Sequence, residues 1–279
     1  MSRATLFLVA TPIGNLADMV PRAVTVLQSV DAIAVEDSRH SGKLLQHFNI
    51  SKPLIPYHDH NERDAAERIL QLLQQGKRVA LISDAGTPAI ADPGYRLVRL
   101  AHQHGVRVES IPGPCAAMAA LAGSGLPSDC FRFNGFLPAK QQARTTALQQ
   151  LTHESATLVF YEAPHRLADT VRDMVSVLGG GREVCLAREL SKHYETLWLT
   201  TLTGLDCAIS EKRVEERGEI VLVVAGAGDR TVDDDESSRI LKILLAELPV
   251  KQASALASQI TGAPKRELYQ RALAWKETP

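Results

Sequence analysis

The sequence predicts an α/β protein built from two α/β domains and a small C-terminal helical unit. Strand and helix signals alternate through the first half of the chain, which is typical of a parallel sheet covered by helices. A second series of apolar strand signals begins near Phe131, and after Gly226 the composition becomes first acidic and then basic and helical. These changes predict an N-terminal domain, a second domain, an acidic linker and a helical unit at residues 1–124, 125–228, 229–236 and 237–279.

The first domain is expected to contain a mainly parallel sheet that is buried on both faces, because its strands are short, apolar and separated by helix-length segments. The expected strands are 5–10, 31–37, 77–83 and 106–112, and the expected helices are 20–30, 61–76, 92–105 and 113–125. Asp92 is expected to cap the third of these helices, with Pro93 in its first turn.

The second domain repeats the mixture of strands and helices. Strands are expected within 131–138, 156–166, 182–190, 194–202 and 218–226, with a helix at 167–178. Adjacent α/β domains leave a cleft between them, and such clefts are a usual place for ligands.

Residues 237–279 contain three helix-like pieces, with a glycine and proline break in the segment ITGAPKREL. This pattern is typical of a helix-turn-helix unit. The unit has seven lysines and arginines against three glutamates, a net charge of +4. A nucleic-acid contact and a helical protein-interaction unit would both account for these features.

The bulk composition indicates an ordinary globular protein. The formal net charge is −1, so the overall charge favours no particular partner. No apolar run approaches the ~20 residues that cross a bilayer, and the apolar N-terminal segment stops at Pro12, too early for the core of a signal peptide. The four cysteines have no CxxC spacing and are typical of reduced thiols. We therefore expect a cytoplasmic protein with no membrane partner.

Unusual loops follow three of the expected strands. They are VATPIGNLAD (9–18), SDAGTPAIADPG (83–94) and IPGPCAA (111–117). Ligands of open α/β sheets bind beyond the carboxyl ends of the strands, so these loops predict a binding site at one edge of the sheet. Any one of them alone could equally be a tight turn without a ligand. None contains the GxGxxG or GxxxxGK[ST] pattern of a nucleotide-phosphate loop.

Two other chemistries have little support in the sequence. His58 and His60, like His102 and His104, are two residues apart, so neither pair shares a helical face. Since no further ligands accompany them, no metal site is expected. The GxSxG nucleophile elbow of α/β hydrolases is absent.

Eight segments carry a resemblance that covers essentially the whole chain. They are LFLVATPIGNLAD, AVEDSRHSGKLL, LISDAGTPAIADPG, SIPGPCAAMAALAGSGLP, FNGFLP, VFYEAPHRL, ARELSKHYET and GEIVLVVAG. Together they resemble the tetrapyrrole methylase superfamily, and more closely its ribosomal RNA small-subunit methyltransferase I branch. The resemblance implies two domains of the tetrapyrrole methylase type with S-adenosylmethionine in the cleft between them, and a homodimer. It also implies 2′-O-methylation of a cytidine ribose in the decoding region of small-subunit (16S) rRNA, either naked or in the assembled small subunit.

Two departures from the tetrapyrrole-acting members bear on the substrate. The first loop is poorer in glycine, and the sequence from Asp84 to Pro88 reads DAGTP where those members carry Gly-Asp-Pro. A methyltransferase acting on a small tetrapyrrole is therefore the alternative function. A third possibility, a non-enzymatic nucleic-acid-binding regulator that uses the C-terminal helices, leaves the three loops without a role.

The resemblance also implies which residues contact the cofactor. Gly86 would let the backbone approach the ligand without a Cβ, Asp84 would supply negative charge, and the small Ala116 would leave room for a flat base. For Cys115 and Tyr161, a role as ordinary core side chains is as compatible with the sequence as a cofactor contact. The complete expected set is Pro12, Asp84, Ala85, Gly86, Cys115, Ala116 and Tyr161.

Methyl transfer to a ribose requires more than a donor site. A 2′-hydroxyl is a poor nucleophile, so the reaction needs in-line positioning and a proton acceptor. The candidates for this base are Asp37, Glu162 and, if its pKa is depressed, Lys192. The sequence does not select among them.

Guanidinium groups suit phosphate oxygens, so Arg39, Arg166 and Arg188 are candidate RNA contacts. Lys265 and Arg266 of the C-terminal unit are further candidates. For each of these charged residues a solvated or salt-bridged surface role is equally compatible with the sequence.

Overall fold

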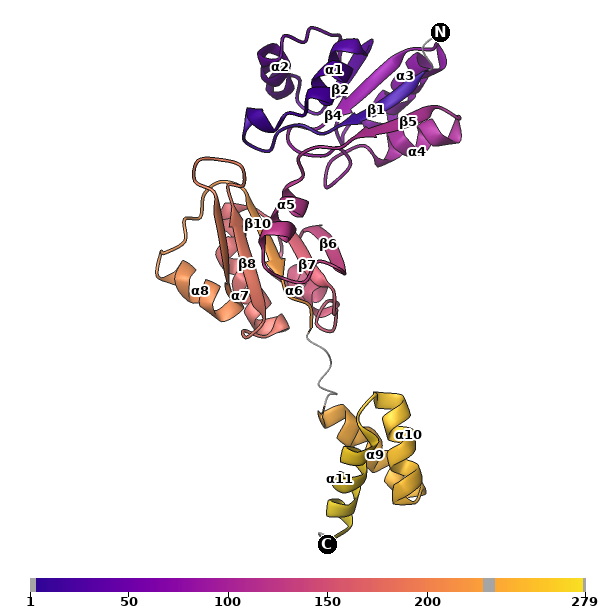
Figure 1. The fold of residues 1–279 in the computed structure, drawn as a ribbon, viewed down its shortest axis with the longest axis vertical. Coiled ribbons are helices and arrows are strands. Elements are labelled where there is room, and N and C mark those ends of the chain that lie inside the picture. Colours follow the sequence, from indigo (N-terminus) through magenta and orange to yellow (C-terminus); the bar gives the residue numbers. More distant parts are fainter. Residues whose placement is uncertain (1–3, 228–233, 278–279) are drawn as a thin grey trace. The chain divides into compact units, whose positions relative to one another are not determined.

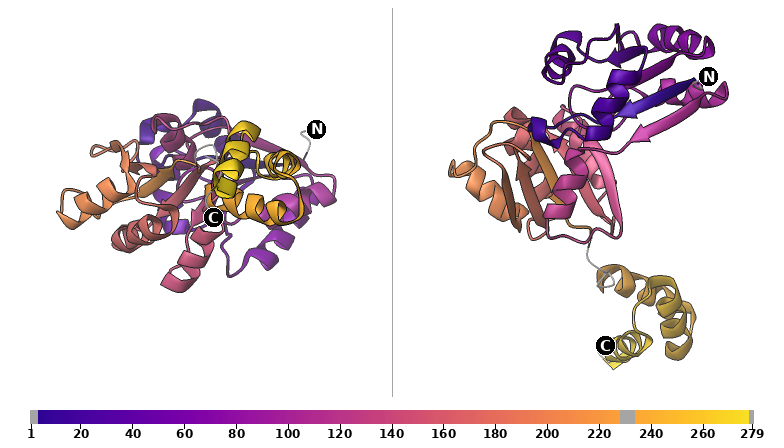
Figure 2. Two further views of the ribbon diagram at one scale, coloured as in Figure 1. Left: turned by 90° about the horizontal axis from the view of Figure 1, so that it is seen from below. Right: turned by 45° about the horizontal axis from the view of Figure 1, so that its top comes forward.

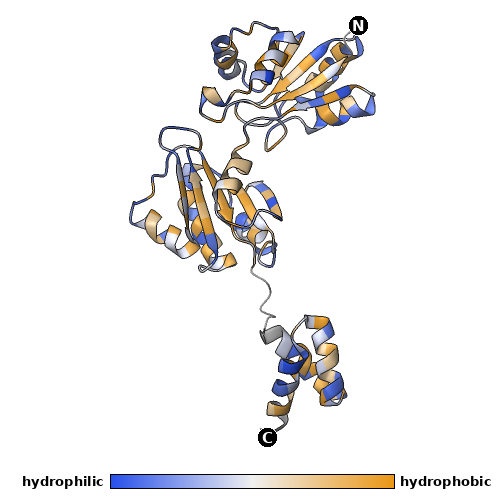
Figure 3. Cartoon of the chain, in the orientation of Figure 1, coloured by the Kyte–Doolittle hydropathy of each residue, from blue (hydrophilic) through white to orange (hydrophobic). Residues whose placement is uncertain are grey.

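The computed structural model describes residues 4–227 and 234–277, and the chain divides into two compact units, Met1–Gly226 and Ala227–Pro279. The first unit contains two five-stranded sheets, and the second is helical (Figure 1). The predicted α/β class with a C-terminal helical unit is therefore confirmed. In Figure 3 the strands of both sheets are mostly hydrophobic, whereas the helices that cover them alternate between hydrophobic and hydrophilic positions.

The first sheet is entirely parallel, with strand order β3-β2-β4-β1-β5. The expected strands are all present, and the structure adds the short β3, which the sequence analysis did not identify. The strands are β1 (Thr5–Val9), β2 (Ala32–Val35), β3 (Leu54–Pro56), β4 (Arg78–Ile82) and β5 (Arg107–Ile111).

Helices cover both faces of this sheet. On one face α1 (Pro21–Ser29) and α2 (Ser38–His47) pack on side chains such as Val9, and on the other α3 (Glu62–Gln74) and α4 (Tyr95–Gln103) cover Leu6 and its neighbours. Burial on both faces explains why the strands read as continuous apolar runs. Because all five strands point the same way, their carboxyl ends and following loops share one edge.

The second sheet is mixed, with order β6-β7-β10-β8-β9 and a single parallel pair, β6 with β7. One face is covered by α6 (Gln141–Gln149), α7 (Leu167–Leu178) and α8 (Leu202–Ser210). The strands are β6 (Phe131–Phe136), β7 (Thr157–Glu162), β8 (Glu183–Arg188), β9 (Thr196–Thr201) and β10 (Ile220–Val224).

The opposite face of the second sheet is covered by α5 (Ala116–Gly123), the magenta helix that lies along the sheet in Figure 2. Ala117, Ala120 and Leu121 are buried there with Val159 and Val221. The sequence analysis placed this helix before the domain boundary at 124, and its packing surface belongs to the second sheet. Small side chains are needed because the helix backbone lies close to the strands.

Helix α4 differs from the expectation in a way that affects the site. It begins at Tyr95 after Gly94, and no side chain caps its first turn. The prediction that Asp92 caps this helix is therefore wrong. The preceding loop has positive φ angles at Ala89 and Ala91, 67° and 65°, and it continues through residues 92–94, which the sequence pattern assigned to the helix.

The second unit contains α9 (Asp234–Glu247), α10 (Val250–Thr261) and α11 (Lys265–Glu277). They enclose a small apolar core that includes Leu241 and Leu268. The expected break occurs at Gly262, whose φ of 77° ends α10 in a left-handed conformation. Helix α9 begins within the range predicted as the linker, while Asp229 and Asp233 of that range lie outside the described residues.

Candidate active site

The three unusual loops meet at the carboxyl edge of the first sheet, as predicted. Thr11 and Gly86 form an isolated antiparallel bridge, with N···O distances of 2.8 Å and 3.0 Å in the two directions. The Thr87 hydroxyl donates to the carbonyl of Pro114 at 2.9 Å. The loop after β4 is thus tied on one side to the loop after β1 and on the other to the loop after β5.

Gly86 is required by its backbone conformation. Its φ is +83°, a value that L side chains rarely adopt, and a Cβ there would lie at an ordinary 3.5 Å from Ile13 Cγ2. The space would admit a methyl group, so the constraint is the dihedral angle rather than a clash. The bridge to Thr11 holds this conformation in place.

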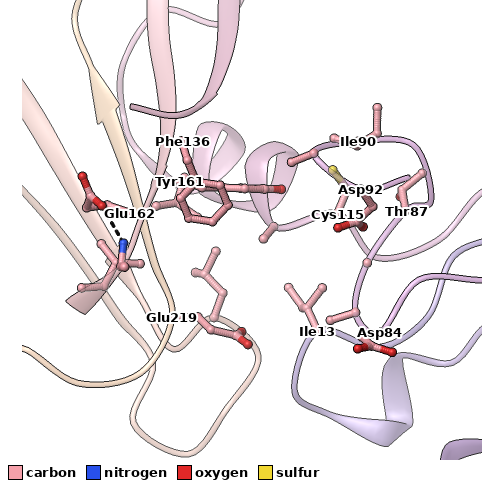
Figure 4. A pocket seen from close by; sticks show the side chains of 18 of the residues that line it. Ile13, Asp84, Thr87, Ile90, Asp92, Cys115, Phe136, Tyr161, Glu162 and Glu219 are labelled. Carbon is pink, nitrogen blue, oxygen red and sulfur yellow. Dashed lines mark hydrogen bonds between the residues drawn. The ribbon is translucent and has the colours of Figure 1, made fainter. Parts of the chain in front are cut away.

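A cavity of about 440 Å³ lies between these loops and the second sheet (Figure 4). Its size is within the range of roughly 300–1,000 Å³ that is common for small-molecule sites. The first domain contributes residues of the β1, β2, β4 and β5 loops, and the second contributes residues of β6, β7 and β10 with the segments beside them. The cleft expected between two α/β domains is therefore present.

The lining of the cavity is acidic. Five carboxylate side chains belong to it, and none of its lining residues is a lysine, arginine or histidine. Coulomb attraction in a partly desolvated cavity favours a ligand that carries positive charge. The five are Glu36, Asp84, Asp92, Glu162 and Glu219.

Two of these carboxylates titrate abnormally. Burial raises the pKa of Glu36, and the negative charges of Asp92 and Asp84 raise it further. Burial also raises the pKa of Asp92; a hydrogen bond from Ser83 opposes this effect, and the nearby Asp84 adds to it. Carboxylates with raised pKa values in a cavity are candidates for accepting and releasing protons.

Six of the seven expected cofactor residues line the cavity: Asp84, Ala85, Gly86, Cys115, Ala116 and Tyr161. Pro12 is buried beside the lining residue Ile13 and is not part of the lining. Tyr161 lies on β7 of the second domain. Its hydroxyl accepts a hydrogen bond from the amide of Ala117 in α5 at 3.3 Å. Burial, with a smaller contribution from Cys115, raises the pKa of Tyr161 to about 12, so this side chain is a neutral phenol.

The three expected bases, Lys192, Asp37 and Glu162, differ from the expectation in their position or their protein contacts. Lys192 lies between Glu189 and Glu219, at 2.8 Å and 3.2 Å. Burial alone would lower the pKa of Lys192, and the hydrogen bonds to these two carboxylates outweigh it, so the pKa is raised. The prediction of a lysine with a depressed pKa is therefore wrong.

Asp37 lies outside the cavity lining and caps α2. Its carboxylate accepts hydrogen bonds from the Arg39 and His40 amides at 2.7 Å and 3.3 Å. These bonds lower the pKa of Asp37, which weakens it as a proton acceptor. The Asp37 amide in turn donates to Asp84 at 3.2 Å, which links the start of α2 to the cavity.

Glu162 lines the cavity, although its carboxylate is committed to protein partners. It accepts a hydrogen bond from the Thr170 hydroxyl at 2.5 Å and another from the Ala163 amide at 2.7 Å. The Arg166 guanidinium lies 3.4 Å away, and only 1% of the Glu162 side chain is exposed. Figure 4 shows the carboxylate turned away from the opposite wall. This arrangement is that of a structural anchor.

The five candidate RNA contacts differ in exposure and in their protein partners. Arg166 donates to the carbonyls of Leu137 and Pro138, and Arg188 pairs with Glu215 while only 12% of its side chain is exposed. Arg39 is 95% exposed, and Lys265 and Arg266 are exposed at the start of α11. The structure therefore leaves Arg39, Lys265 and Arg266 the most accessible of the five.

The sequence analysis missed Glu36, Asp92 and Glu219 as cavity residues. Glu36 and Asp92 had a usable signal, because Glu36 lies at the end of a predicted strand and Asp92 lies in the loop after another, both at the edge where ligands bind. Glu219 comes from the start of a strand in the other domain, and only the tertiary arrangement places it at the cavity.

The described residues contain neither a metal cluster nor a membrane-spanning helix. Within 4–227 and 234–277, no group of three or more His, Cys, Asp or Glu side chains is arranged to hold a metal ion. No helix in the same ranges is both long enough and apolar enough to cross a membrane.

Comparison with known proteins assigns the fold to a class. The family model Tetrapyrrole (Corrin/Porphyrin) Methylases matches residues 5–206. The uroporphyrin-III-C-methyltransferase from Thermus thermophilus has a TM-score of 0.55 at 20% identity, covering 79% of this chain and 94% of that one. Diphthine synthase has a TM-score of 0.59 at 14% identity, covering 79% and 90%. The fold is that of the tetrapyrrole methylase family, to which the chain belongs.

Closer relatives narrow the class. Ribosomal RNA small subunit methyltransferase I of Pseudomonas aeruginosa is 52% identical over 98% of this chain and 98% of its own. The protein of the same name from Escherichia coli O157:H7 is 50% identical over 98% and 96%. The model of the RsmI C-terminal HTH domain matches residues 231–276. The chain belongs to the ribosomal RNA small subunit methyltransferase I family.

Proposed function

We propose that this protein transfers a methyl group from S-adenosylmethionine to the ribose 2′-hydroxyl of a cytidine in the decoding region of 16S rRNA, in the cytoplasm. The observation that carries the donor assignment is the acidic cavity, which has no basic side chain in its lining. The acceptor assignment rests on family membership, since the relatives are named for the small ribosomal subunit. The tetrapyrrole alternative rests on structural neighbours whose 20% identity or less supports the fold alone.

The residues of the cavity fit this donor. S-adenosylmethionine supplies an electrophilic methyl group on a sulfonium ion when it is bound. Asp84 and Asp92 offer negative charge toward a sulfonium or ammonium group, while the backbone at Ala85 and Gly86 is available for polar contacts at the strand end. The small side chains of Ala85 and Ala116 leave room for a flat ring.

Removal of the hydroxyl proton requires a base inside the cavity. Asp92 and Glu36 combine a position in the lining with a raised pKa, so they replace the three residues expected from the sequence. We assign the proton-accepting role to Asp92, whose raised pKa comes from burial and from the nearby Asp84 and Asp59, and whose own charge raises the pKa of Glu36. A carboxylate whose pKa moves toward the working pH is a better general base.

The test of the whole proposal uses small ribosomal subunits from cells that lack this protein. Purified protein with labelled S-adenosylmethionine is expected to place one methyl group on a cytidine ribose, located by mass mapping of the rRNA. Naked 16S rRNA, assayed in parallel, identifies which form is the substrate. Absence of ribose methylation on both forms would contradict the proposal.

Gly86→Val is the variant that tests the donor site within this experiment. A branched residue at φ +83° strains the bridge to Thr11, so we expect S-adenosylmethionine affinity to fall at least ~10-fold, or about 1.4 kcal/mol. Gly105→Val is the matched control. Gly105 has a φ of +66° and no atom within 4 Å of its Cβ position, and it follows α4, away from the cavity. Equal losses of affinity in both variants would contradict the assignment of the loop.

The second unit is proposed to hold RNA. Lys265 and Arg266 are exposed at the start of α11, in a unit whose net charge over 237–279 is +4. Replacing both by alanine should weaken subunit binding and flatten its salt dependence, because each lost phosphate contact removes ~0.7–0.9 from the log–log slope. Binding measured between low and moderate salt checks this, with the exposed Lys251→Ala as the control.

The homodimer implied by the resemblance is also a proposal. Leu197 and Leu199 of β9 are 41% and 43% exposed, and Met118 of α5 is 41% exposed. These exposed apolar side chains are available for contact with a second copy.

Sedimentation of the Lys265→Ala/Arg266→Ala variant tests whether the helical unit binds RNA or mediates self-association. A changed oligomeric state with an unchanged salt slope would assign α11 to self-association instead of RNA.

A further inference from the structure

Strand β6 contains a bulge that directs one aromatic side chain into the cavity. Phe133 pairs with Val159 and Phe136 pairs with Tyr161, so three steps along β6 match two steps along β7. The extra residue lies between Phe133 and Gly135, and Gly135 has a φ of +60°. Bulges of this kind re-aim side chains and are common beside active sites.

The bulge determines which face of the sheet carries Phe136. Side chains alternate along a regular strand, so residues three apart point to opposite faces. The extra residue cancels one alternation and returns Phe136 to the face of Phe133. Tyr161 lies against both rings, with centroids 5.0 Å from Phe133 and 5.6 Å from Phe136 in edge-to-face geometry.

The Phe136 ring contacts Tyr161 on one side and is exposed at the cavity on the other. It lines the cavity, and 56% of it is exposed. In Figure 4 Phe136 and Tyr161 lie on the wall opposite Asp84, Thr87 and Asp92. A fixed phenyl ring that remains largely exposed at the rim of a cavity provides a face on which another planar group can stack.

We propose that Phe136 stacks on the base of the target nucleotide, which must leave its RNA stack to bring the ribose into the cavity. This inference rests on the proposed function. Enzymes that modify a base extrude the nucleotide and hold the base between apolar and aromatic side chains, and aromatic side chains likewise hold unpaired nucleotides by stacking on their bases. The acidic groups assigned to the donor belong to the opposite wall, and the Phe136 ring is 56% exposed. Phe136 is thus a substrate-positioning residue, held in place by Tyr161 and the bulge.

The experiment compares Phe136→Ala with Phe131→Ala in steady-state methylation of small subunits. Phe131 is a matched control on the same strand, because it is 40% exposed and is not part of the cavity lining. For Phe136→Ala we expect KM for the subunit to rise about tenfold or more, while the calorimetric affinity for S-adenosylmethionine stays within about twofold. Phe136→Trp should restore most of the loss, since it returns an aromatic face, whereas Phe136→Leu should not.

Each other outcome bears on the proposal. A parallel loss of S-adenosylmethionine affinity in Phe136→Ala would place the ring in the donor site and overturn the inference. Equal effects of the Phe131 and Phe136 variants, or full activity of Phe136→Leu, would also overturn it. Thermal unfolding of every variant identifies a folding defect, in which case the comparison of Leu with Trp decides. Failure of the proposed function is distinguishable, because the wild-type protein would then methylate neither subunits nor naked rRNA.

Discussion

Replacing Asp92 with asparagine is expected to lower the rate of methyl transfer by about 10²–10⁴-fold, the usual contribution of a general base. The substitution keeps the size of the side chain and removes its ability to take the hydroxyl proton. Because four other carboxylates line the cavity, affinity for S-adenosylmethionine should change by less than about tenfold. Single-turnover methylation and calorimetry on the same protein measure the two quantities separately.

The same variant should be more stable than the wild type at neutral pH. A carboxyl group whose pKa is raised on folding binds its proton more tightly in the folded state, so stability is lost as the pH rises from the unfolded to the folded pKa. Asp92→Asn removes this loss, and the gain in the free energy of unfolding should be on the order of 1 kcal/mol. The difference should vanish below the unfolded pKa of about 3.9, where both states are protonated.

The control is Glu36→Gln, which alters the other lining carboxylate with a raised pKa. We expect it to leave the acidic limb of the pH–rate profile in place, because the pKa of Asp92 is raised by burial and by the charges of Asp84 and Asp59. Transfer should continue. A larger rate loss in Glu36→Gln than in Asp92→Asn would exchange the roles of the two residues.

Much of the fold could be predicted because burial on both faces leaves a direct trace in the sequence. Strands such as β4 and β10 are continuous apolar runs, and the three loops could be assigned to one edge because parallel strands end together. The three-residue β3 is too short to show such a trace. Helix α2 begins with charged and polar residues and was not among the expected helices; the sequence analysis named Asp37 and Arg39 there only as candidate site residues.

The site was less predictable, because its chemistry depends on contacts between distant parts of the chain. Asp92 resembles a helix cap in sequence, but α4 begins only at Tyr95 and the Asp92 carboxylate does not cap it. Lys192 could not be judged without knowing that Glu219 lies 3.2 Å away. A bulge, which decides the direction of Phe136, has no reliable signal in one sequence.

Arg166→Ala is expected to destabilise the protein by about 3–5 kcal/mol, the usual cost of removing one partner from a buried ion pair. The sequence made Arg166 a candidate phosphate contact, with a salt-bridged role equally compatible, and its guanidinium lies 3.4 Å from Glu162 with only 18% of the side chain exposed. It also donates to the carbonyl of Leu137 at 2.6 Å. The variant leaves the Glu162 carboxylate without its cation, and denaturant unfolding measures the cost.

Two further variants show whether this cost comes from the pair. Arg172→Ala removes a cation from α7, the helix that follows Arg166. Arg172 and Asp169 form a surface pair with side chains 64% and 66% exposed, so the loss should stay below about 1 kcal/mol. Glu162→Gln combined with Arg166→Met removes both charges and should recover part of the stability lost in Arg166→Ala, since no buried charge is left unpaired. If Arg166→Ala instead unfolds like the wild type and loses affinity for the small subunit, Arg166 is a phosphate contact after all. A pair that links β7 to the start of α7 would then have to open when RNA binds, because the guanidinium cannot serve both partners in the geometry seen here.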